Sequence, residues 1–278
     1  MSLYISSLNS GSNGNCYYIG NQNEAVLIDA GLSCRDTETR MTRLGLSMKI
    51  VKAVFISHEH TDHTRGAQVI SRKYQIPVYT SAGTFNSRRI SVDPDKVMHF
   101  TAYSPVNIGN LAVSAFPKRH DAFDPHSFTI TGNGITVGVL TDLGSSCEHV
   151  ITNFSKCHAA FLEANYDEEM LENGLYPYIL KSRIRSDYGH LSNRQSLDLF
   201  KQHKPEFMSH LLLSHLSQDN NNPRLVLELF EKHCGSTRVS IASRHHESKV
   251  FHITGEMAPG LSGNPEIVNQ RSIQMWLF

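Results

Sequence analysis

The sequence of 278 residues predicts an α/β fold in which two sheets pack together and helices lie outside them. Short apolar runs with strand character recur in both halves of the chain, with helical segments among them. Apolar residues make up 40% of the composition, enough for a substantial core, and charged residues only 19%. No Pro/Ser-rich linker, charge block or repeat divides the chain, so we expect one domain over residues 1–278.

The first half of the chain is rich in strands. Short β-type runs are expected at residues 3–8, 16–19, 25–29, 53–56 and 77–79, and the turn SGSNGN separates the first two. Helical spacing predicts helices over residues 36–44 and 65–74. The strand at 53–56 runs directly into the string SHEHTDH.

The second half alternates helices with strands. Strands are expected at residues 111–116, 127–131, 136–140, 159–162, 208–213, 238–242 and 250–253. Ser192 opens a helix with a capping box, because Gln195 stands three residues further on. Asn222 caps another helix, with Pro223 in its first turn. The segment after Thr254 is rich in turn residues, and no role is assigned to it.

Charge and cysteine usage exclude several classes of protein. Lys plus Arg equals Asp plus Glu at 26 each, so no global positive field attracts nucleic acid. The five cysteines form no C-x-x-C pair, which argues against a disulfide framework and against a cysteine-based zinc site. The first residues do not resemble a signal peptide, and no apolar stretch approaches the roughly 20 residues that span a bilayer. We therefore expect a cytoplasmic protein with no membrane contact.

The strongest chemical signal is the string HEHTDH at residues 58–63. Its four candidate ligands cannot all face one side of a strand or helix, but they can converge on a loop at a strand end. His58 and His60 can bind one metal ion, and Asp62 and His63 a second one close by. Nitrogen and oxygen donors of this type suit Zn²⁺, Mn²⁺ or Fe²⁺. The alternative is a solvated, histidine-rich loop.

Three further candidate ligands follow apolar strands. His120 follows the strand at 111–116, Asp142 the strand at 136–140, and His215 the strand at 208–213. Each alone is more often an ordinary loop residue, but with the first cluster they form a repeated pattern. A carboxylate such as that of Asp142 can bridge two cations, which an imidazole cannot.

The order of these motifs resembles that of the metallo-β-lactamase superfamily, and within it the WalJ (YycJ)-like branch. The resemblance covers most of the chain and rests on the strings LNSGSNGNCYYI, VLIDAGLS, FISHEHTDH, HDAFDP, TDLG, LEANYDEEML, GHLSN and LSHLSQDNNNP. It implies the four-layer αββα sandwich of that fold, with two mixed sheets and helices on the outer faces. It also implies a DNA exonuclease or phosphodiesterase.

The resemblance assigns a role to each candidate ligand. It implies two divalent metal ions, Zn²⁺ or Mn²⁺. One ion would be held by His58, His60 and His120, and the other by Asp62, His63 and His215. Asp142 would bridge the two ions, and Asp29 would orient the metal-binding loop from behind. His126 competes with His120 for its place, although the string HDAFDP favours His120.

His190 distinguishes phosphodiesterases from other members of the superfamily. It resembles the histidine that contacts phosphate or protonates the leaving oxygen in those branches. The neighbouring helix N-terminus, after Ser192, is expected to offer a phosphate seat. The alternative is a histidine that is hydrogen-bonded locally in the capping loop.

Several other residues are weaker candidates for contacts with substrate. Asn165 is expected near the site, and the SGSNGN turn could present backbone N–H groups there, although a plain hairpin turn is the simpler interpretation. Tyr166 stands where related sequences tend to have histidine. A local basic patch, or equally an ordinary solvated surface, could be formed by Lys118, Arg119, Lys181, Arg183, Arg185 and Arg194.

The candidate ligands and the resemblance together predict a phosphodiester hydrolase with two metal ions that uses a metal-bridging hydroxide as nucleophile. The resemblance implies that it is a DNA exonuclease. The expected catalytic residues are His190, Asp62 and Asp142, and the partner is a nucleic acid or nucleotide phosphodiester. One alternative is a metal-dependent hydrolase of a thiolester, lactone or other non-phosphate bond, and another is a binding module with a structural metal. The native metal, the type of nucleic acid, the polarity of digestion and the oligomeric state are not predicted.

Overall fold

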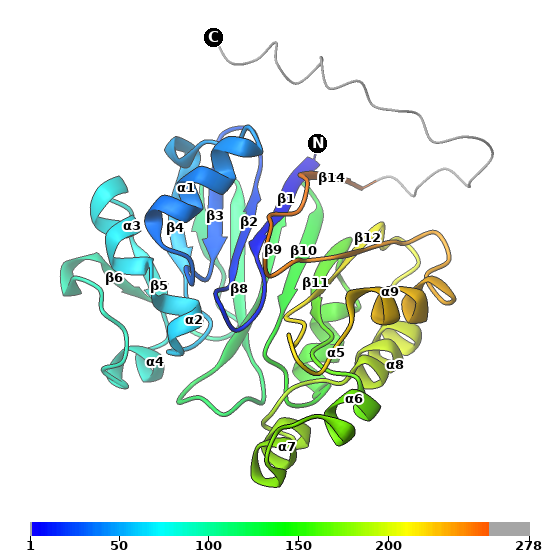
Figure 1. The fold of residues 1–278 in the computed structure, drawn as a ribbon. Helices are drawn as coiled ribbons and strands as arrows, with labels where there is room; N and C mark the ends of the chain where they lie inside the picture. The colour runs from blue at the N-terminus through cyan, green and yellow to red at the C-terminus, as the bar shows by residue number, and fades with distance from the viewer. Residues whose placement is uncertain (1, 256–278) are drawn as a thin grey trace.

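Two sheets of seven strands face one another in the computed structural model, which describes residues 2–255 (Figure 1). The first sheet has the strand order β14 (Phe251–Thr254), β1 (Ser2–Asn9), β2 (Cys16–Gly20), β3 (Ala25–Ile28), β4 (Val51–Phe55), β5 (Val78–Thr80) and β6 (Val97–His99). The second has the order β13 (Arg238–Ile241), β12 (His210–Ser214), β11 (Ala159–Glu163), β10 (Ile135–Leu140), β9 (His126–Gly132), β8 (Leu111–Pro117) and β7 (Val106–Ile108).

Both sheets are mixed. Strands β3 to β6 are parallel, and so are β10 to β13, whereas the remaining pairs are antiparallel hairpin-type ladders. In a parallel set, all carboxyl ends lie at one edge of the sheet, where ligands commonly bind. Strand β8 runs in the same direction as β10, because each is antiparallel to β9. The loops after β3, β4, β8, β10, β11 and β12 therefore all emerge at carboxyl ends of like-directed strands.

Helices cover the outer face of each sheet (Figure 1). The helices that connect strands of the first sheet are α1 (Cys34–Arg43), α2 (Thr61–Thr64), α3 (Ala67–Tyr74) and α4 (Ala82–Asn86). The second is accompanied by α5 (Glu148–Phe154), α6 (Glu168–Asn173), α7 (Tyr178–Arg185), α8 (Asn193–His203) and α9 (Pro223–Glu231). No helix in the described part of the chain is long and apolar enough to cross a membrane.

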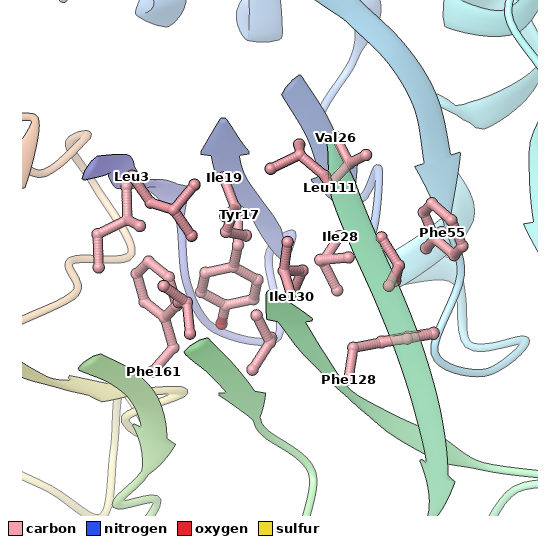
Figure 2. Close-up of a cluster of buried hydrophobic side chains, with 14 of the residues drawn as sticks. Leu3, Tyr17, Ile19, Val26, Ile28, Phe55, Leu111, Phe128, Ile130 and Phe161 are labelled. Atoms are coloured by element: carbon pink, nitrogen blue, oxygen red, sulfur yellow. The ribbon is translucent and has the colours of Figure 1, made fainter. Parts of the chain in front are cut away.

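Alternation along the strands separates three apolar cores. In β2, Tyr17 and Ile19 point between the sheets, where they meet residues such as Phe161 of the second sheet (Figure 2). The intervening Tyr18 joins the core beneath α1 and α3. A third core lies between the second sheet and helices α5, α8 and α9. Because these strands are buried on both faces, they appear in the sequence as continuous apolar runs.

The predicted sandwich is confirmed, and most predicted elements are found within a residue or two of their expected bounds. The capping box at Ser192 and the cap at Asn222 are confirmed. The helix predicted over 65–74 is found as α3, which begins at Ala67 with Gly66 as its N-cap; a Cβ atom at Gly66 would lie 2.0 Å from the Leu32 carbonyl oxygen. The short elements β6, β7 and α4 to α7 were not predicted, and residues 256–278 of the expected domain lie outside the described residues.

Candidate metal centre

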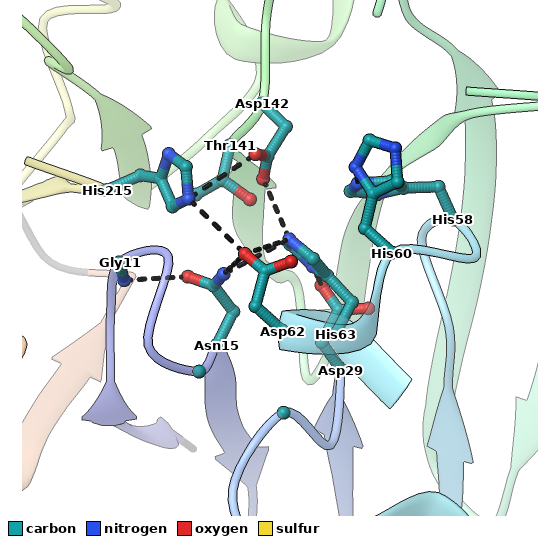
Figure 3. A network of polar contacts seen from close by, with 12 residues as sticks. Gly11, Asn15, Asp29, His58, His60, Asp62, His63, Thr141, Asp142 and His215 are labelled. Carbon is teal, nitrogen blue, oxygen red and sulfur yellow. Dashed lines mark hydrogen bonds and ion pairs between the residues drawn. The ribbon is translucent and has the colours of Figure 1, made fainter. Parts of the chain in front are cut away.

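The seven predicted ligands follow four strands, β4, β8, β10 and β12, and meet at one edge of the sandwich. Figure 3 labels all of them except His120. His58 and His60 lie in the loop after β4, as expected. Asp62 and His63 lie instead on the short helix α2, whose N-cap is His60. This single turn of helix shifts their side chains toward the carboxyl ends of the second sheet, which supplies the remaining ligands.

The first group of candidate ligands consists of His58, His60 and His120. One ring nitrogen from each lies within 4.8 Å of the others. Nε2 of His58 is 3.0 Å from Nδ1 of His60, and the rings of His58 and His120 have centroids 4.9 Å apart. Burial lowers the pKa of His58 well below its usual value and that of His120 to about 3. Both imidazoles are therefore neutral, which is the form that binds a metal ion.

The second group consists of Asp62, His63 and His215, whose ligand atoms also lie within 4.8 Å of one another. Asp142 lies between the two groups. Its Oδ2 is 3.4 Å from Nε2 of His63, and its Oδ1 is 3.4 Å from Nε2 of His215 and 4.0 Å from Nε2 of His120. One carboxylate thus contacts histidines of both groups.

Four of these histidines have their other ring nitrogen held by the protein. Nδ1 of His63 is 2.7 Å from Oδ2 of Asp29, and Nδ1 of His120 is 3.1 Å from the Gly189 carbonyl oxygen. The corresponding partners are the Ser57 hydroxyl for His58, at 2.9 Å, and Glu163 for His215, at 3.1 Å. Metal-binding histidines commonly have such a partner, because it sets the tautomer and the orientation of the ring.

The donor set fits divalent cations. Oδ2 of Asp142 and Nε2 of His215 are buried and have no hydrogen-bond partner, which is costly unless an ion satisfies them. Burial lowers the pKa of His215, but Asp142, Asp62 and Glu163 outweigh that effect and raise it to about 10. This excess of negative charge favours a cation at the second group.

Three residues at this edge have a left-handed backbone. The φ angles of Asp29, Asp142 and His215 are 60°, 55° and 56°, values that are uncommon outside glycine. Each residue directly follows a strand or lies two residues beyond it. Asp and His tolerate this conformation better than β-branched residues do, and such backbone strain clusters at functional sites.

Glu163, at the end of β11, was missed by the sequence analysis. Its Oε1 lies 2.8 Å from Nδ1 of His190 and 3.1 Å from Nδ1 of His215, and its Oε2 accepts the Leu143 N–H at 2.6 Å. Burial raises the pKa of Glu163, but His190 and His215 outweigh burial and lower the pKa to about 2. The signal was present, because an apolar strand followed by a potential ligand is the pattern that identified Asp142 and His215.

The SGSNGN turn reaches the centre through a side chain. Nδ2 of Asn15 lies 3.2 Å from Oδ2 of Asp62 and 3.1 Å from Nε2 of His63, while Oδ1 accepts the Gly11 N–H at 2.9 Å (Figure 3). The backbone is also close, since Asn15 N donates to the Asp62 carbonyl at 2.7 Å. Next to it, a Cβ atom on Gly31 would lie 1.7 Å from that carbonyl oxygen, so only glycine fits there.

The expected basic patch does not form as a free surface. Lys118 is buried, and its Nζ donates to the Thr141 carbonyl oxygen at 2.8 Å. The other five candidates are engaged on the surface: Arg119 with Asp187, Lys181 with the Glu172 carbonyl, Arg183 with Asp121, Arg185 with Glu172 and Arg194 with Glu168. The four arginines are thus paired with carboxylates, whereas both lysines donate to backbone carbonyl oxygens.

The expected phosphate seat at the start of α8 is also largely used by the protein. The Asn193 N–H donates to the Tyr166 carbonyl oxygen at 2.8 Å, and the Gln195 N–H donates to the Ser192 hydroxyl at 3.2 Å. That hydroxyl in turn donates to Glu168 at 2.6 Å. The capping box thus satisfies the groups that a phosphate would need.

Of the remaining candidates, Asn165 lies at the site, whereas His126 and Tyr166 are not among the candidate ligands. Nδ2 of Asn165 donates to the His215 carbonyl oxygen at 2.8 Å. His126 lies at the start of β9 and takes no part in the candidate ligand groups of the described residues, so His120 has the position that HDAFDP favoured. Tyr166 is buried and forms an isolated bridge with Ser192.

Comparison with known proteins gives consistent results. The sequence profile of the beta-lactamase superfamily domain matches residues 24–215. The exodeoxyribonuclease YycJ of Bacillus anthracis is 33% identical over 229 residues, covering 81% of this chain and 87% of that protein. The exodeoxyribonuclease WalJ of Streptococcus pneumoniae is 31% identical over 224 residues, covering 79% and 83%.

Solved structures show the same fold at low sequence identity. The metallo-beta-lactamase fold protein YhfI of Bacillus subtilis has a TM-score of 0.69 at 17% identity, covering 91% of this chain and 100% of its own. Zn²⁺-bound PqqB of Methylobacterium extorquens has a TM-score of 0.69 at 12% identity, with coverages of 88% and 99%. The short form of human tRNase Z has a TM-score of 0.59 at 15% identity, with coverages of 88% and 98%.

Proposed function

Since this chain belongs to the β-lactamase superfamily and is a metal-dependent hydrolase, we propose that it hydrolyses phosphodiester bonds and acts on DNA as an exonuclease. The names of the two exodeoxyribonuclease relatives support the choice of substrate. We further propose that the centre holds two divalent ions, Zn²⁺ or Mn²⁺. One is bound by His58, His60 and His120, the other by Asp62, His63 and His215, and Asp142 lies between them.

The observation that carries the proposal is the placement of His190. Its side chain is 22% exposed, and its ring lies 5.2 Å, centroid to centroid, from those of His120 and His215. It belongs to neither proposed ligand triplet, although one of its ring nitrogens lies within 4.8 Å of ligand atoms of Asp142, Glu163 and His215. A histidine at the open edge of a metal centre is placed to contact a phosphate oxygen or a leaving group.

Glu163 determines which nitrogen of His190 is available. A carboxylate can only accept a hydrogen bond, so Nδ1 of His190 must carry the hydrogen that Oε1 of Glu163 accepts. Nε2 is then left to hold a proton when the ring is charged, and to give it to the leaving oxygen.

The metal ions would supply Lewis acidity, which activates water and stabilises charge developing on phosphate. The protein supplies position. Asp29 holds the ring of His63, and Asn15 lies against both members of the α2 pair. Hydrogen bonds to the other ring nitrogens fix the orientation of the ligand side chains. Less reorganisation of these side chains is then needed during the reaction.

The test is digestion of end-labelled single-stranded and duplex DNA by purified protein. Bound metal is removed from the protein with a chelator, and Mn²⁺ or Zn²⁺ is then added back, with the Asp142→Asn variant as control. Release of mononucleotides that needs both the metal and Asp142 is the expected result, and the position of the label gives the polarity. Intact DNA under both metals would contradict the nuclease proposal and direct attention to small phosphodiesters, thiolesters and lactones.

A further inference from the structure

A cavity of about 210 Å³ lies beside the candidate metal centre. His190 and His215 form its inner wall, so a group bound in it is next to the reacting bond. The outer wall comes from α7, which the sequence did not predict. The loop after β12, residues 216–217, closes the opposite side.

The walls of the cavity differ in chemistry. Leu180 and Ile184, one helical turn apart on α7, line it together with Leu216. Asn165 and Ser217 add an amide and a hydroxyl. The charged side chains of Asp121 and Arg183 also line the cavity, so its lining is mixed, with one apolar face formed by Leu180, Ile184 and Leu216. An apolar face beside polar groups suits a flat ring attached to a polar sugar.

Helix α7 lines the cavity and contributes little to the core. None of its eight residues is buried. It is held by Arg183, whose Nε lies 2.6 Å from Oδ2 of Asp121, and by contacts of Lys181 and Arg185 with Glu172. Asp121 also lies 3.2 Å from Nε2 of His120, so one carboxylate links α7 to the metal centre. A helix whose residues are at most half-buried, but which is tied to the centre, is explained if it serves the substrate.

We propose that this cavity binds the terminal nucleoside of a DNA strand and that Leu180 and Ile184 contact its base. The inference rests on the proposed function. Pockets for drug-sized ligands span roughly 300–1,000 Å³, so a cavity of about 210 Å³ suits one nucleoside rather than a base pair. The cavity thereby selects a frayed or single-stranded end and limits the product to mononucleotides.

The test measures binding of thymidine 3′- and 5′-monophosphate against inorganic phosphate, by calorimetry on the Mn²⁺-loaded protein. Inorganic phosphate reports the metal centre alone, whereas a nucleotide also reports the cavity. The wild-type protein should bind one of the nucleotides roughly tenfold or more tightly than phosphate. In Leu180→Trp the larger ring fills the cavity, and this preference should fall about tenfold, with phosphate binding and metal content unchanged.

Matched variants make the result specific. Ile179 is on the same helix but is 83% exposed and does not line the cavity, so Ile179→Trp should retain the preference. Leu180→Ala removes the contact without adding bulk and should also weaken nucleotide binding. Equal affinity of the wild-type protein for phosphate and both nucleotides, or an unchanged preference in Leu180→Trp, would overturn the inference. Failure of the wild-type protein to release mononucleotides from DNA would instead overturn the proposed function.

Discussion

Oε1 of Glu163 lies 2.8 Å from Nδ1 of His190 and 3.1 Å from Nδ1 of His215. One buried carboxylate therefore holds both the proposed proton donor and a proposed metal ligand. Substitutions at the two positions should therefore have different effects. A change at His190 should affect proton transfer alone, whereas a change at Glu163 should affect both proton transfer by His190 and metal binding by His215.

Replacing His190 by alanine should lower kcat by about 10²–10⁴-fold, the usual contribution of general acid–base catalysis. Metal content should stay as in the wild-type protein, because His190 is not a member of either proposed ligand triplet. Mass spectrometric metal analysis beside steady-state kinetics provides the measurement. Loss of metal from His190→Ala would mean that His190 is itself a ligand.

Replacing Glu163 by glutamine should weaken metal binding by about 10–100-fold, the usual effect of losing a partner behind a ligand. Glutamine keeps the shape of the side chain but removes the negative charge that contacts Nδ1 of both His190 and His215. Competition with a fluorescent chelator measures the affinity. Wild-type metal affinity together with wild-type kcat would show that the Glu163 charge is not used.

Replacing Asp142 by asparagine should lower the metal content and reduce activity by more than about 100-fold. Asparagine is preferred to alanine for this purpose, because residue 142 has a φ angle of 55° and asparagine tolerates that conformation. The measurement is the number of metal ions per chain after dialysis. Full metal content would exclude Asp142 as a ligand.

Two substitutions of Asp29 distinguish the effect of its carboxylate on metal binding from the effect of its backbone conformation on stability. Both Asp29→Ala and Asp29→Gly remove the carboxylate that holds His63, so each should weaken metal binding about 10–100-fold. The φ angle of 60° strains alanine but not glycine, so only Asp29→Ala should lose about 1–2 kcal/mol more in unfolding free energy. Denaturant titration compares the two. Equal stabilities would argue against strain at this position.

His210, at the start of β12, should make stability depend on pH. Burial, with Arg238 and Lys249 adding to it, lowers the pKa of His210 from 6.5 to about 4. Its neutral form is compatible with the folded state, so the stability is fully present above pH 6.5 and is lost as pH falls toward 4. The Tm of the wild-type protein should fall by a few °C more than that of His210→Gln over this range. An equal fall in Tm for the wild-type protein and His210→Gln would contradict the lowered pKa of His210.

Ligands that follow apolar strands could be predicted from the sequence, whereas their partners could not. Asp142 and His215 follow runs long enough to be identified as strands, and the HEHTDH string is dense enough to stand out alone. Glu163 follows a similar run, but its importance depends on β11 lying between β10 and β12, which is a matter of strand order. Asn15 is distant from Asp62 in sequence, and the two meet only because β2 and β3 pair beside β4.

Apolar periodicity and donor chemistry are local properties, so the two packed sheets, the ligand types and their order along the chain could be predicted from the residues alone. Which charges remain free depends on the three-dimensional structure. Lys118 is buried under Thr141, Arg183 is paired with Asp121, and the start of α8 is satisfied by its own cap. The tertiary structure also placed α7 beside the candidate metal centre, although none of its eight residues is fully buried. The physical reason is that pairing and burial depend on distances between segments far apart in the chain, which no local pattern records.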